Sequence, residues 1–196
     1  MLKVGITGNI GGGKTTVSKI FEILGVPVFY ADEAAKKVMT EDEVLIAGLK
    51  EAFGEAAYFE DGSLNRKHIA GIVFNDEKEL AKLNALAHPA VFRAFDNWVS
   101  QKDMPYVMKE AALLFESGSY KMCDKTIMVT APLEMRIKRV MQRDGFTREE
   151  ILSREARQFT EEKKSAMADF VIKNDDSELV IPQVLKLHEL FCSLAH

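Results

Sequence analysis

Residues 8–16 read GNIGGGKTT, and this short stretch decides the fold of the chain. Gly8, Gly13, Lys14 and Thr15 match the Gly-x-x-x-x-Gly-Lys-Ser/Thr pattern of a phosphate-binding loop. A chance match in a chain of this length is on the order of one per cent. Glycines let backbone N–H groups turn toward phosphate oxygens, and the start of a following helix adds partial positive charge. We expect Lys14 to reach the β- and γ-phosphates of a nucleotide and Thr15 to bind Mg²⁺. The alternative is a structural glycine-rich turn with an exposed lysine.

The residues on both sides of the loop predict the strand and the helix that such a loop requires. Residues 2–7 form a short β-branched run, which is typical of a buried strand. Gly25 stands where a helix after the loop would end. The apolar positions that repeat with helical spacing before it are Val17, Ile20, Phe21 and Leu24.

The rest of the chain alternates between strand-like and helix-like segments. Further strands are predicted at residues 26–30, 106–108, 126–130 and 170–172, with helices between them. Strands separated by helices imply a mostly parallel sheet with helices on both faces. We therefore predict an α/β fold, the three-layer P-loop NTPase fold. Its sheet core is expected to comprise residues 1–58, 102–135 and 165–196.

A helical subdomain is predicted at residues 59–101. The segment opens with a turn at Asp61 and Gly62. We expect its helices to be interrupted near His88 and Pro89, because the residue before a proline disfavours helical geometry. Three aromatic side chains at helical spacing are expected to pack in a core rather than to form a stacking platform: Phe92, Phe95 and Trp98.

A charged lid is predicted at residues 136–164, where arginine and lysine are dense. Gly145 is expected to end one helix of this segment. Thr147 and Glu150 have the spacing of a capping box, which would start another helix. We expect the segment to close over a nucleotide and to exclude water.

Composition limits the classes of function. The chain has 196 residues, 47% apolar and 29% charged, as expected of one compact domain. With 26 basic and 30 acidic residues the net charge is −4, which gives no global attraction to nucleic acid or to an anionic membrane. Cys123 and Cys192 are far apart and suit neither a disulfide framework nor a zinc site. No apolar run is long enough for a signal peptide or a membrane span, so we expect a cytoplasmic protein.

Residues outside the loop favour a small-molecule kinase over other nucleotide-binding proteins. The guanine-reading Asn-Lys-x-Asp segment of a GTPase is missing from the sequence, and residues 173–176 have the wrong order. Asp32 follows the second predicted strand, and ligands of parallel sheets bind outside the carboxyl ends of strands. Its carboxylate could accept the proton of an acceptor hydroxyl and aim the oxygen at the γ-phosphorus. An N-cap of the next helix is an equally good interpretation of Asp32.

Several segments resemble one kinase family in order and spacing: ITGNIGGGKTTVSKIF, LGVPVFYAD, LNRKHIAGIVFND, LNALAHPAV, LLFESG, RVMQRD and ADFVIKND. On these residues the chain resembles the dephospho-CoA kinase family over nearly its full length. The resemblance implies ATP-dependent phosphorylation of the ribose 3′-hydroxyl of dephospho-CoA, the last step of coenzyme A synthesis. It implies ATP, dephospho-CoA and Mg²⁺ as ligands, without nucleic acid or membrane partners, and a monomer or weak homo-oligomer.

The resemblance also implies roles for individual residues. The catalytic residues it implies are Asp32, Lys14 and Arg139, the last of which would neutralise charge on the transferred phosphoryl group. The ATP-binding residues are Gly8, Gly11, Gly12, Gly13, Lys14, Thr15, Thr16, Arg143 and Asn174, with Thr15 as the metal ligand. The acceptor-binding residues are Thr7, Asp32, Arg66, His88 and Glu116. A solvated helix face is the alternative interpretation of Arg139 and Arg143.

Two positions depart from the pattern of the family. Tyr30-Ala31-Asp32 stands where many members carry Asp-Ala-Asp, so the first acid is missing. Glu110 stands where the Asp of an Asp-x-Pro segment is usual, which keeps a carboxylate near the Mg²⁺ side. Two other functions compete with the one that the resemblance implies: a nucleoside or nucleoside monophosphate kinase, and a nucleotide-binding regulatory module without turnover.

Overall fold

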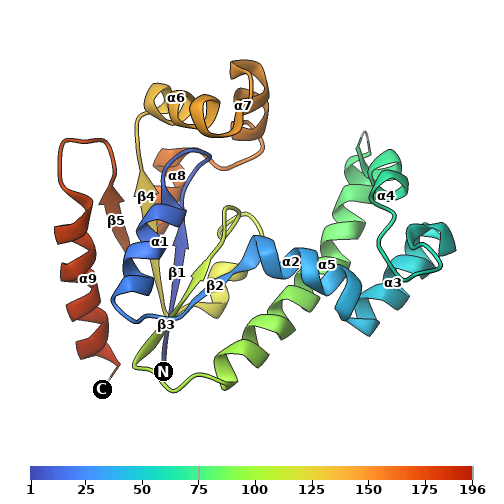
Figure 1. Ribbon diagram of the computed structural model, residues 1–196, viewed down its shortest axis with the longest axis horizontal. Helices are drawn as coiled ribbons and strands as arrows, with labels where there is room; N and C mark the ends of the chain where they lie inside the picture. Colours follow the sequence, from blue (N-terminus) through green and yellow to red (C-terminus); the bar gives the residue numbers. More distant parts are fainter. Residues whose placement is uncertain (75, 196) are drawn as a thin grey trace. The chain divides into compact units, whose positions relative to one another are not determined.

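The computed structural model describes residues 1–74 and 76–195, which fold into two compact units (Figure 1). A sheet unit comprises Met1–Tyr30 with Lys102–His196, and a helical unit comprises Ala31–Gln101. Asn75, in the family-like segment LNRKHIAGIVFND, lies outside the described residues.

The sheet unit is built on a parallel sheet, as predicted. Its strands in the described chain are β1 (Leu2–Thr7), β2 (Val28–Tyr30), β3 (Tyr106–Glu110), β4 (Lys125–Thr130) and β5 (Phe170–Lys173). They lie in the order β2-β3-β1-β4-β5, and each neighbouring pair is parallel. The central strand β1 therefore delivers the glycine loop to the carboxyl edge of the sheet, beside the end of β3.

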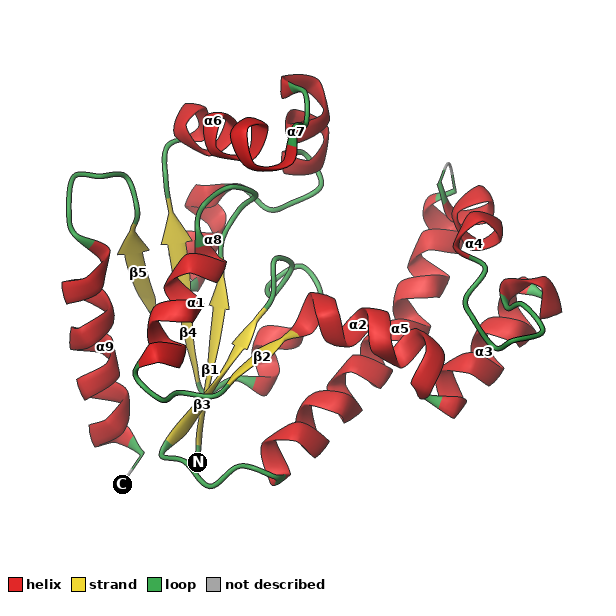
Figure 2. Cartoon of the chain, viewed as in Figure 1, coloured by secondary structure: helices red, strands yellow, loops and turns green. Residues whose placement is uncertain are grey.

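Helices cover the faces of this sheet, and others lie beyond its carboxyl edge (Figure 2). They are α1 (Lys14–Ile23), α6 (Leu133–Asp144), α7 (Arg148–Glu155), α8 (Glu161–Met167), α9 (Val180–Leu194) and the short 3₁₀ helix η2 (Ser119–Met122). The apolar face predicted for α1 packs as expected, with Val17 and Phe21 fully buried against β-strand residues such as Val129. Gly25, at φ 86°, ends the turn after this helix, and α7 begins with the predicted Thr147 capping box.

The second strand is shorter than predicted. It begins at Val28 rather than at residue 26. The reason is local, because the Val26 N–H donates to the Phe21 carbonyl at 3.0 Å and thereby closes the helix end. Pro27 has no N–H to donate to a strand ladder.

The helical unit begins at Ala31, not at the predicted residue 59. It contains α2 (Ala31–Glu41), α3 (Glu43–Phe53), the 3₁₀ helix η1 (Glu55–Ala57), α4 (Arg66–Val73) and α5 (Glu77–Ser100). The helices α2, α3 and α4 each contact α5. Residues 31–58 therefore belong with α5 rather than with the sheet core, because the apolar faces of α2 and α3 are buried there.

The predicted break near His88 and Pro89 is wrong. The helix α5 runs continuously from Glu77 to Ser100 with Pro89 inside it, and its axis changes direction along its length (Figure 2). A proline removes one helical hydrogen bond and bends a helix, but the buried face of α5 holds the two halves together. That face includes Ala87, Ala90, Val91 and Phe95. Phe95 is fully buried and its ring lies 6.3 Å from that of Trp98, which confirms the predicted core packing for Phe95.

No helix within residues 1–74 and 76–195 combines the length and the apolar character needed to cross a bilayer.

Candidate active site

The glycine loop joins β1 to α1 and leaves no room for a side chain at Gly11 or Gly13. Gly11 and Gly13 have φ values of 78° and 93°, the left-handed region that favours glycine. A Cβ at Gly11 would meet the Arg136 carbonyl oxygen at 2.5 Å, and a Cβ at Gly13 would collide with the Asn174 amide nitrogen. The loop can therefore pack against Arg136 and Asn174 only because glycine stands at both positions.

Lys14 and Thr15, the first two residues of α1, both contact the same carboxylate. Lys14 Nζ lies 3.5 Å from Glu110 Oε1, and Thr15 Oγ1 donates to that oxygen at 3.3 Å. Glu110 is the last residue of β3, so the parallel register of β1 and β3 places it beside the loop. Glu110 Oε2 is buried and has no hydrogen-bond partner among the described residues. A hydroxyl beside a carboxylate with a spare oxygen is the donor set that Mg²⁺ prefers.

A pocket of about 340 Å³ adjoins the loop on the side of α6. It is lined by Gly11, Gly13, Thr16, Arg139, Val140, Arg143 and Asn174. Asn174 follows β5, and its Nδ2 donates to the Gly12 carbonyl at 2.9 Å. Arg139 Nη1 donates to the Asn174 carbonyl at 2.9 Å, so Arg139 is not part of a purely solvated helix face. The structure thus brings Arg139, Arg143 and Asn174 together beside the loop.

Arg143 differs from Arg139 in its surroundings. Its side chain is 67% exposed and forms two hydrogen bonds with the neighbouring carboxylate of Asp144, at 2.7 and 2.8 Å. The hydrogen bond from Arg143 lowers the pKa of the Asp144 carboxyl. Arg143 therefore lines the pocket from an exposed position.

Arg136 has a structural role that the charge density of its segment did not reveal. Its guanidinium is buried and forms a bidentate pair with Glu155, at 2.7 and 2.9 Å. It also donates to the Ile10 carbonyl of the loop at 3.2 Å, and Asn9 Nδ2 donates to Glu155 at 2.8 Å. These contacts tie α6 and α7 to the glycine loop. Nothing in the spacing of Arg136 distinguishes it from Lys138 or Arg139.

Thr7 and Glu116 are expected on the acceptor side. Thr7 is the last residue of β1, and Glu116 follows the carboxyl end of β3. Thr7 is buried, and its hydroxyl donates to the Ala112 carbonyl at 3.2 Å. Glu116 Oε1 accepts from the backbone N–H of Phe159 at 2.8 Å and lies 2.9 Å from Lys164 Nζ. Both residues are thus held in the same polar network of the sheet unit.

Asp32, Arg66 and His88 belong to the helical unit. Asp32 is the second residue of α2 and is exposed, so the N-cap interpretation is wrong: the helix has already begun at Ala31. Its charge still suits the first turn of a helix. Arg66, also exposed, starts α4, and His88 is half-buried with its ring 6.3 Å from that of Phe92.

Tyr30, which replaces the usual first acid before Asp32, ends β2 in the sheet unit. Its hydroxyl donates to Glu22 Oε2 at 3.0 Å. The phenol is therefore turned to α1 and makes a surface contact there, which does not reproduce the charge of a carboxylate.

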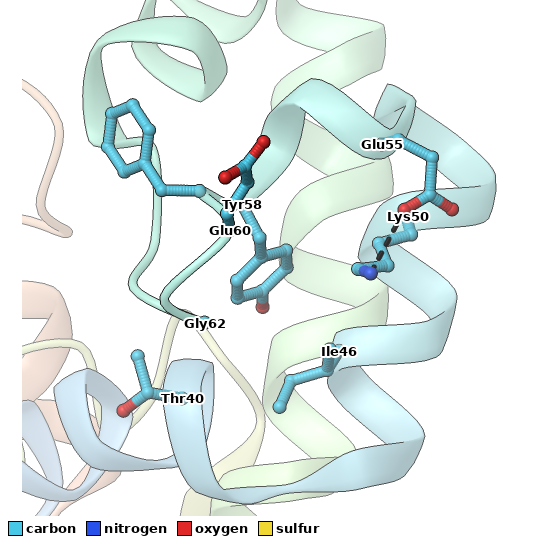
Figure 3. A pocket seen from close by; sticks show the side chains of 8 residues that line it. Thr40, Ile46, Lys50, Glu55, Tyr58, Glu60 and Gly62 are labelled. Carbon is cyan, nitrogen blue, oxygen red and sulfur yellow. Dashed lines mark ion pairs between the residues drawn. The ribbon is translucent and has the colours of Figure 1, made fainter.

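A second pocket, of about 440 Å³, lies within the helical unit (Figure 3). It is lined by Thr40, Ile46, Lys50, Glu55, Tyr58, Phe59, Glu60 and Gly62. Figure 3 shows the Tyr58 ring between Ile46 and the loop that carries Gly62. The Tyr58 hydroxyl donates to the Met39 carbonyl at 2.6 Å, and burial raises its pKa. No motif in the sequence pointed to this pocket.

Comparisons with known proteins agree on one family. The family model described as dephospho-CoA kinase matches residues 2–179. A Bacteroides fragilis relative named dephospho-CoA kinase is 40% identical over 187 residues, 95% of this chain and 91% of the relative. The crystal structure of TT1252 from Thermus thermophilus matches with a TM-score of 0.84 and 38% identity, covering 96% of each chain. Dephospho-CoA kinase from Campylobacter jejuni matches with a TM-score of 0.70 and 27% identity, covering 99% of this chain and 98% of the other.

The substitution Gly11→Ala should weaken ADP binding by at least about tenfold, because the new methyl group adds a clash with Arg136 to the left-handed strain of about 1–2 kcal/mol. Gly25→Ala is the matched control. It carries similar strain at φ 86°, but no atom of the described chain other than those of Gly25 and its two neighbours in sequence lies within 4 Å of its Cβ position. Isothermal titration calorimetry should give Gly25→Ala an affinity within about twofold of the wild type. Equal ADP affinity for Gly11→Ala and the wild type would show that the loop tolerates a side chain.

Proposed function

The chain belongs to the dephospho-CoA kinase family, as its motifs predicted, and we propose that it transfers the γ-phosphoryl group of ATP to the ribose 3′-hydroxyl of dephospho-CoA. The products are CoA and ADP, and the reaction is the last step of coenzyme A biosynthesis. The contact of both Lys14 and Thr15 with Glu110 carries this proposal most directly. It brings the cation, the hydroxyl and the carboxylate needed for phosphoryl transfer to one point at the sheet edge.

The glycine loop and the pocket beside α6 are proposed to bind ATP. Backbone N–H groups of the loop would surround the phosphates, and Lys14 would exchange Glu110 for the β- and γ-phosphate oxygens. The pocket lined by Arg139, Arg143 and Asn174 extends this site on the same unit. We propose that the nucleotide base lies near Asn174, the residue that follows β5.

Thr15 and Glu110 are proposed to hold Mg²⁺. The buried, unpartnered Oε2 of Glu110 fits this role, since a hard cation takes oxygen ligands and removes the cost of leaving that oxygen unsatisfied within the described chain. Bound Mg²⁺ would neutralise charge on the β- and γ-phosphate oxygens. Glu110 thereby supplies the carboxylate that is an Asp in many members of the family.

Asp32 and Arg139 are proposed to act on the transferred group. The bond from the γ-phosphorus to the bridging oxygen of ATP breaks as the acceptor oxygen bonds to that phosphorus. ADP leaves with the bridging oxygen. Asp32 would accept the hydrogen bond of the acceptor hydroxyl and aim its oxygen, which is its main task in a loose transition state, and would take up the proton that the hydroxyl loses as its oxygen bonds to phosphorus. Arg139 would leave the Asn174 carbonyl and neutralise charge on the migrating oxygens.

The remaining parts of the proposal concern the lid, the acceptor contacts, the location and the oligomeric state. Residues 136–164 would form the lid, in which Arg136 and Glu155 contact Ile10 and Asn9 of the loop. The proposed acceptor contacts are Arg66, His88, Thr7 and Glu116. Free thiols at Cys123 and Cys192 suit a cytoplasmic location. We propose a monomer or a weak homo-oligomer.

A panel of acceptors tests the assigned substrate. With ATP and Mg²⁺, ADP release should be at least about 100-fold faster with dephospho-CoA than with any nucleoside or nucleoside monophosphate. Mass spectrometry of the product should show one added phosphoryl group. No turnover of dephospho-CoA, together with turnover of a nucleoside or a nucleotide, would assign the chain to the competing kinase class.

The substitution Asp32→Ala should lower kcat by at least about 100-fold, with ATP affinity within about twofold of the wild type, because Asp32 contacts the acceptor and not the phosphates. Lys14→Ala should lose both rate and ATP affinity, since the lysine contacts phosphate in the ground and transition states alike. Glu33→Ala, at the exposed neighbouring acid of the same helical turn, is the control and should keep wild-type activity. Full activity of Asp32→Ala would remove Asp32 from the mechanism.

A further inference from the structure

A buried lysine, Lys164, lies beside the proposed active site and has no part in the mechanism above. It belongs to α8, and its side chain has 0% exposed surface. Lysine is almost never fully buried unless an opposite charge compensates its ammonium group. The partners of Lys164 therefore decide what it can do.

Lys164 makes two polar contacts within the described chain. Its Nζ lies 2.9 Å from Glu116 Oε1 and donates to the Ala112 carbonyl at 2.9 Å. Glu116 Oε1 also accepts the backbone N–H of Phe159 at 2.8 Å, so this oxygen is held from two sides. Two of the three ammonium hydrogens thus hold the side chain of Glu116 and the carbonyl of Ala112, which precedes it in the chain.

The Lys164–Glu116 pair lies at the edge of the sheet where ligands bind. The Ala112 carbonyl also accepts from the hydroxyl of Thr7, the last residue of β1 before the glycine loop, at 3.2 Å. Ala112 itself stands two residues beyond Glu110, the last residue of β3. Burial lowers the pKa of Lys164 against the opposing effect of Glu116, and the charge of Lys14 adds to the lowering. The pair is thus connected through the Ala112 carbonyl to Thr7, the residue that precedes the glycine loop.

Glu116 keeps one oxygen free for a ligand. Its Oε2 is buried and has no hydrogen-bond partner in the part of the chain that the structure describes. A buried carboxylate oxygen without a donor is costly and is rare in folded proteins. A donor group of a bound ligand would satisfy it.

We propose that Lys164 is a positioning residue for the acceptor substrate. It holds the Glu116 carboxylate in a fixed orientation, so that the free Oε2 accepts a hydrogen bond from a hydroxyl or amino group of that substrate. The inference rests on the proposed function and deepens it by naming an acceptor-recognition atom and the residue that orients it. Lys164 acts through Glu116, because its own hydrogen bonds go to protein atoms.

KM and binding affinity, measured separately for the acceptor and for the nucleotide, distinguish this role from a purely structural one. Lys164→Met should raise KM for dephospho-CoA, and weaken its binding in calorimetry without ATP, by at least about tenfold. KM for ATP and the affinity for ADP should stay within about twofold, because the pair does not touch the nucleotide site. Lys163→Met is the matched control. Lys163 is exposed and lies over the Phe159 ring, 3.3 Å from its centroid.

Two further variants test the proposal if Lys164→Met leaves Glu116 unpaired and does not fold. Glu116→Gln preserves shape, and the double variant Lys164→Met with Glu116→Gln removes both charges. The single and the double variant should lose dephospho-CoA affinity by a similar factor. The two substitutions break the same contact with the acceptor, so their effects are not additive. Thermal melting establishes that the variants are folded.

The outcomes separate this inference from the proposed function. Wild-type turnover of dephospho-CoA with unchanged acceptor KM in folded variants would overturn the inference alone. So would an equal loss of affinity for ADP and dephospho-CoA, which indicates a general structural role. Wild-type protein that neither binds nor phosphorylates dephospho-CoA would overturn the proposed function and this inference with it.

Discussion

Close packing around Gly11 and Gly13 is the constraint on which the rest of the site depends. Both residues adopt left-handed backbone, and the Arg136 carbonyl and the Asn174 side chain occupy the space where a Cβ would stand. The loop therefore packs directly against α6 and against the segment after β5. The same contacts that shape the loop bring Arg139 to its edge. A phosphate site and the arginine that would act on the phosphate thus arise from one packing arrangement.

Two carboxylates at the carboxyl edge of the sheet have the same kind of surroundings. Glu110 and Glu116, at the end of β3 and just beyond it, each face a lysine of a different helix, Lys14 or Lys164. Each also keeps one buried oxygen without a partner in the described chain. Proteins seldom leave buried acceptors unsatisfied except where a ligand completes them. The two carboxylates are therefore interpreted as prepared for different ligands, the metal at Glu110 and the acceptor at Glu116.

Local sequence patterns predicted the sheet unit well and the helical unit less well. The Gly-Lys-Thr loop, the strand before it, Gly25 and the Thr147 capping box are short-range features, so their geometry follows from neighbouring residues. The continuity of α5 through Pro89 depends instead on packing against helices distant in sequence, which no local rule contains. The buried roles of Arg136 and Lys164 were missed for the same reason: in sequence they are indistinguishable from the exposed charges beside them. Glu110 and Asn174 lie beside the loop, and the roles that the family resemblance implies for them remain predictions.

The central claim is that the loop binds the triphosphate of ATP with Mg²⁺ between Thr15 and Glu110. A crystal structure with a non-hydrolysable ATP analogue and Mg²⁺ measures this directly. The account predicts β- and γ-phosphates within the loop of residues 8–16, Lys14 moved from Glu110 onto the phosphates, and the metal contacting Thr15 Oγ1 and Glu110. Phosphates bound away from the loop, or Glu110 still paired with Lys14 while nucleotide and metal are present, would contradict it.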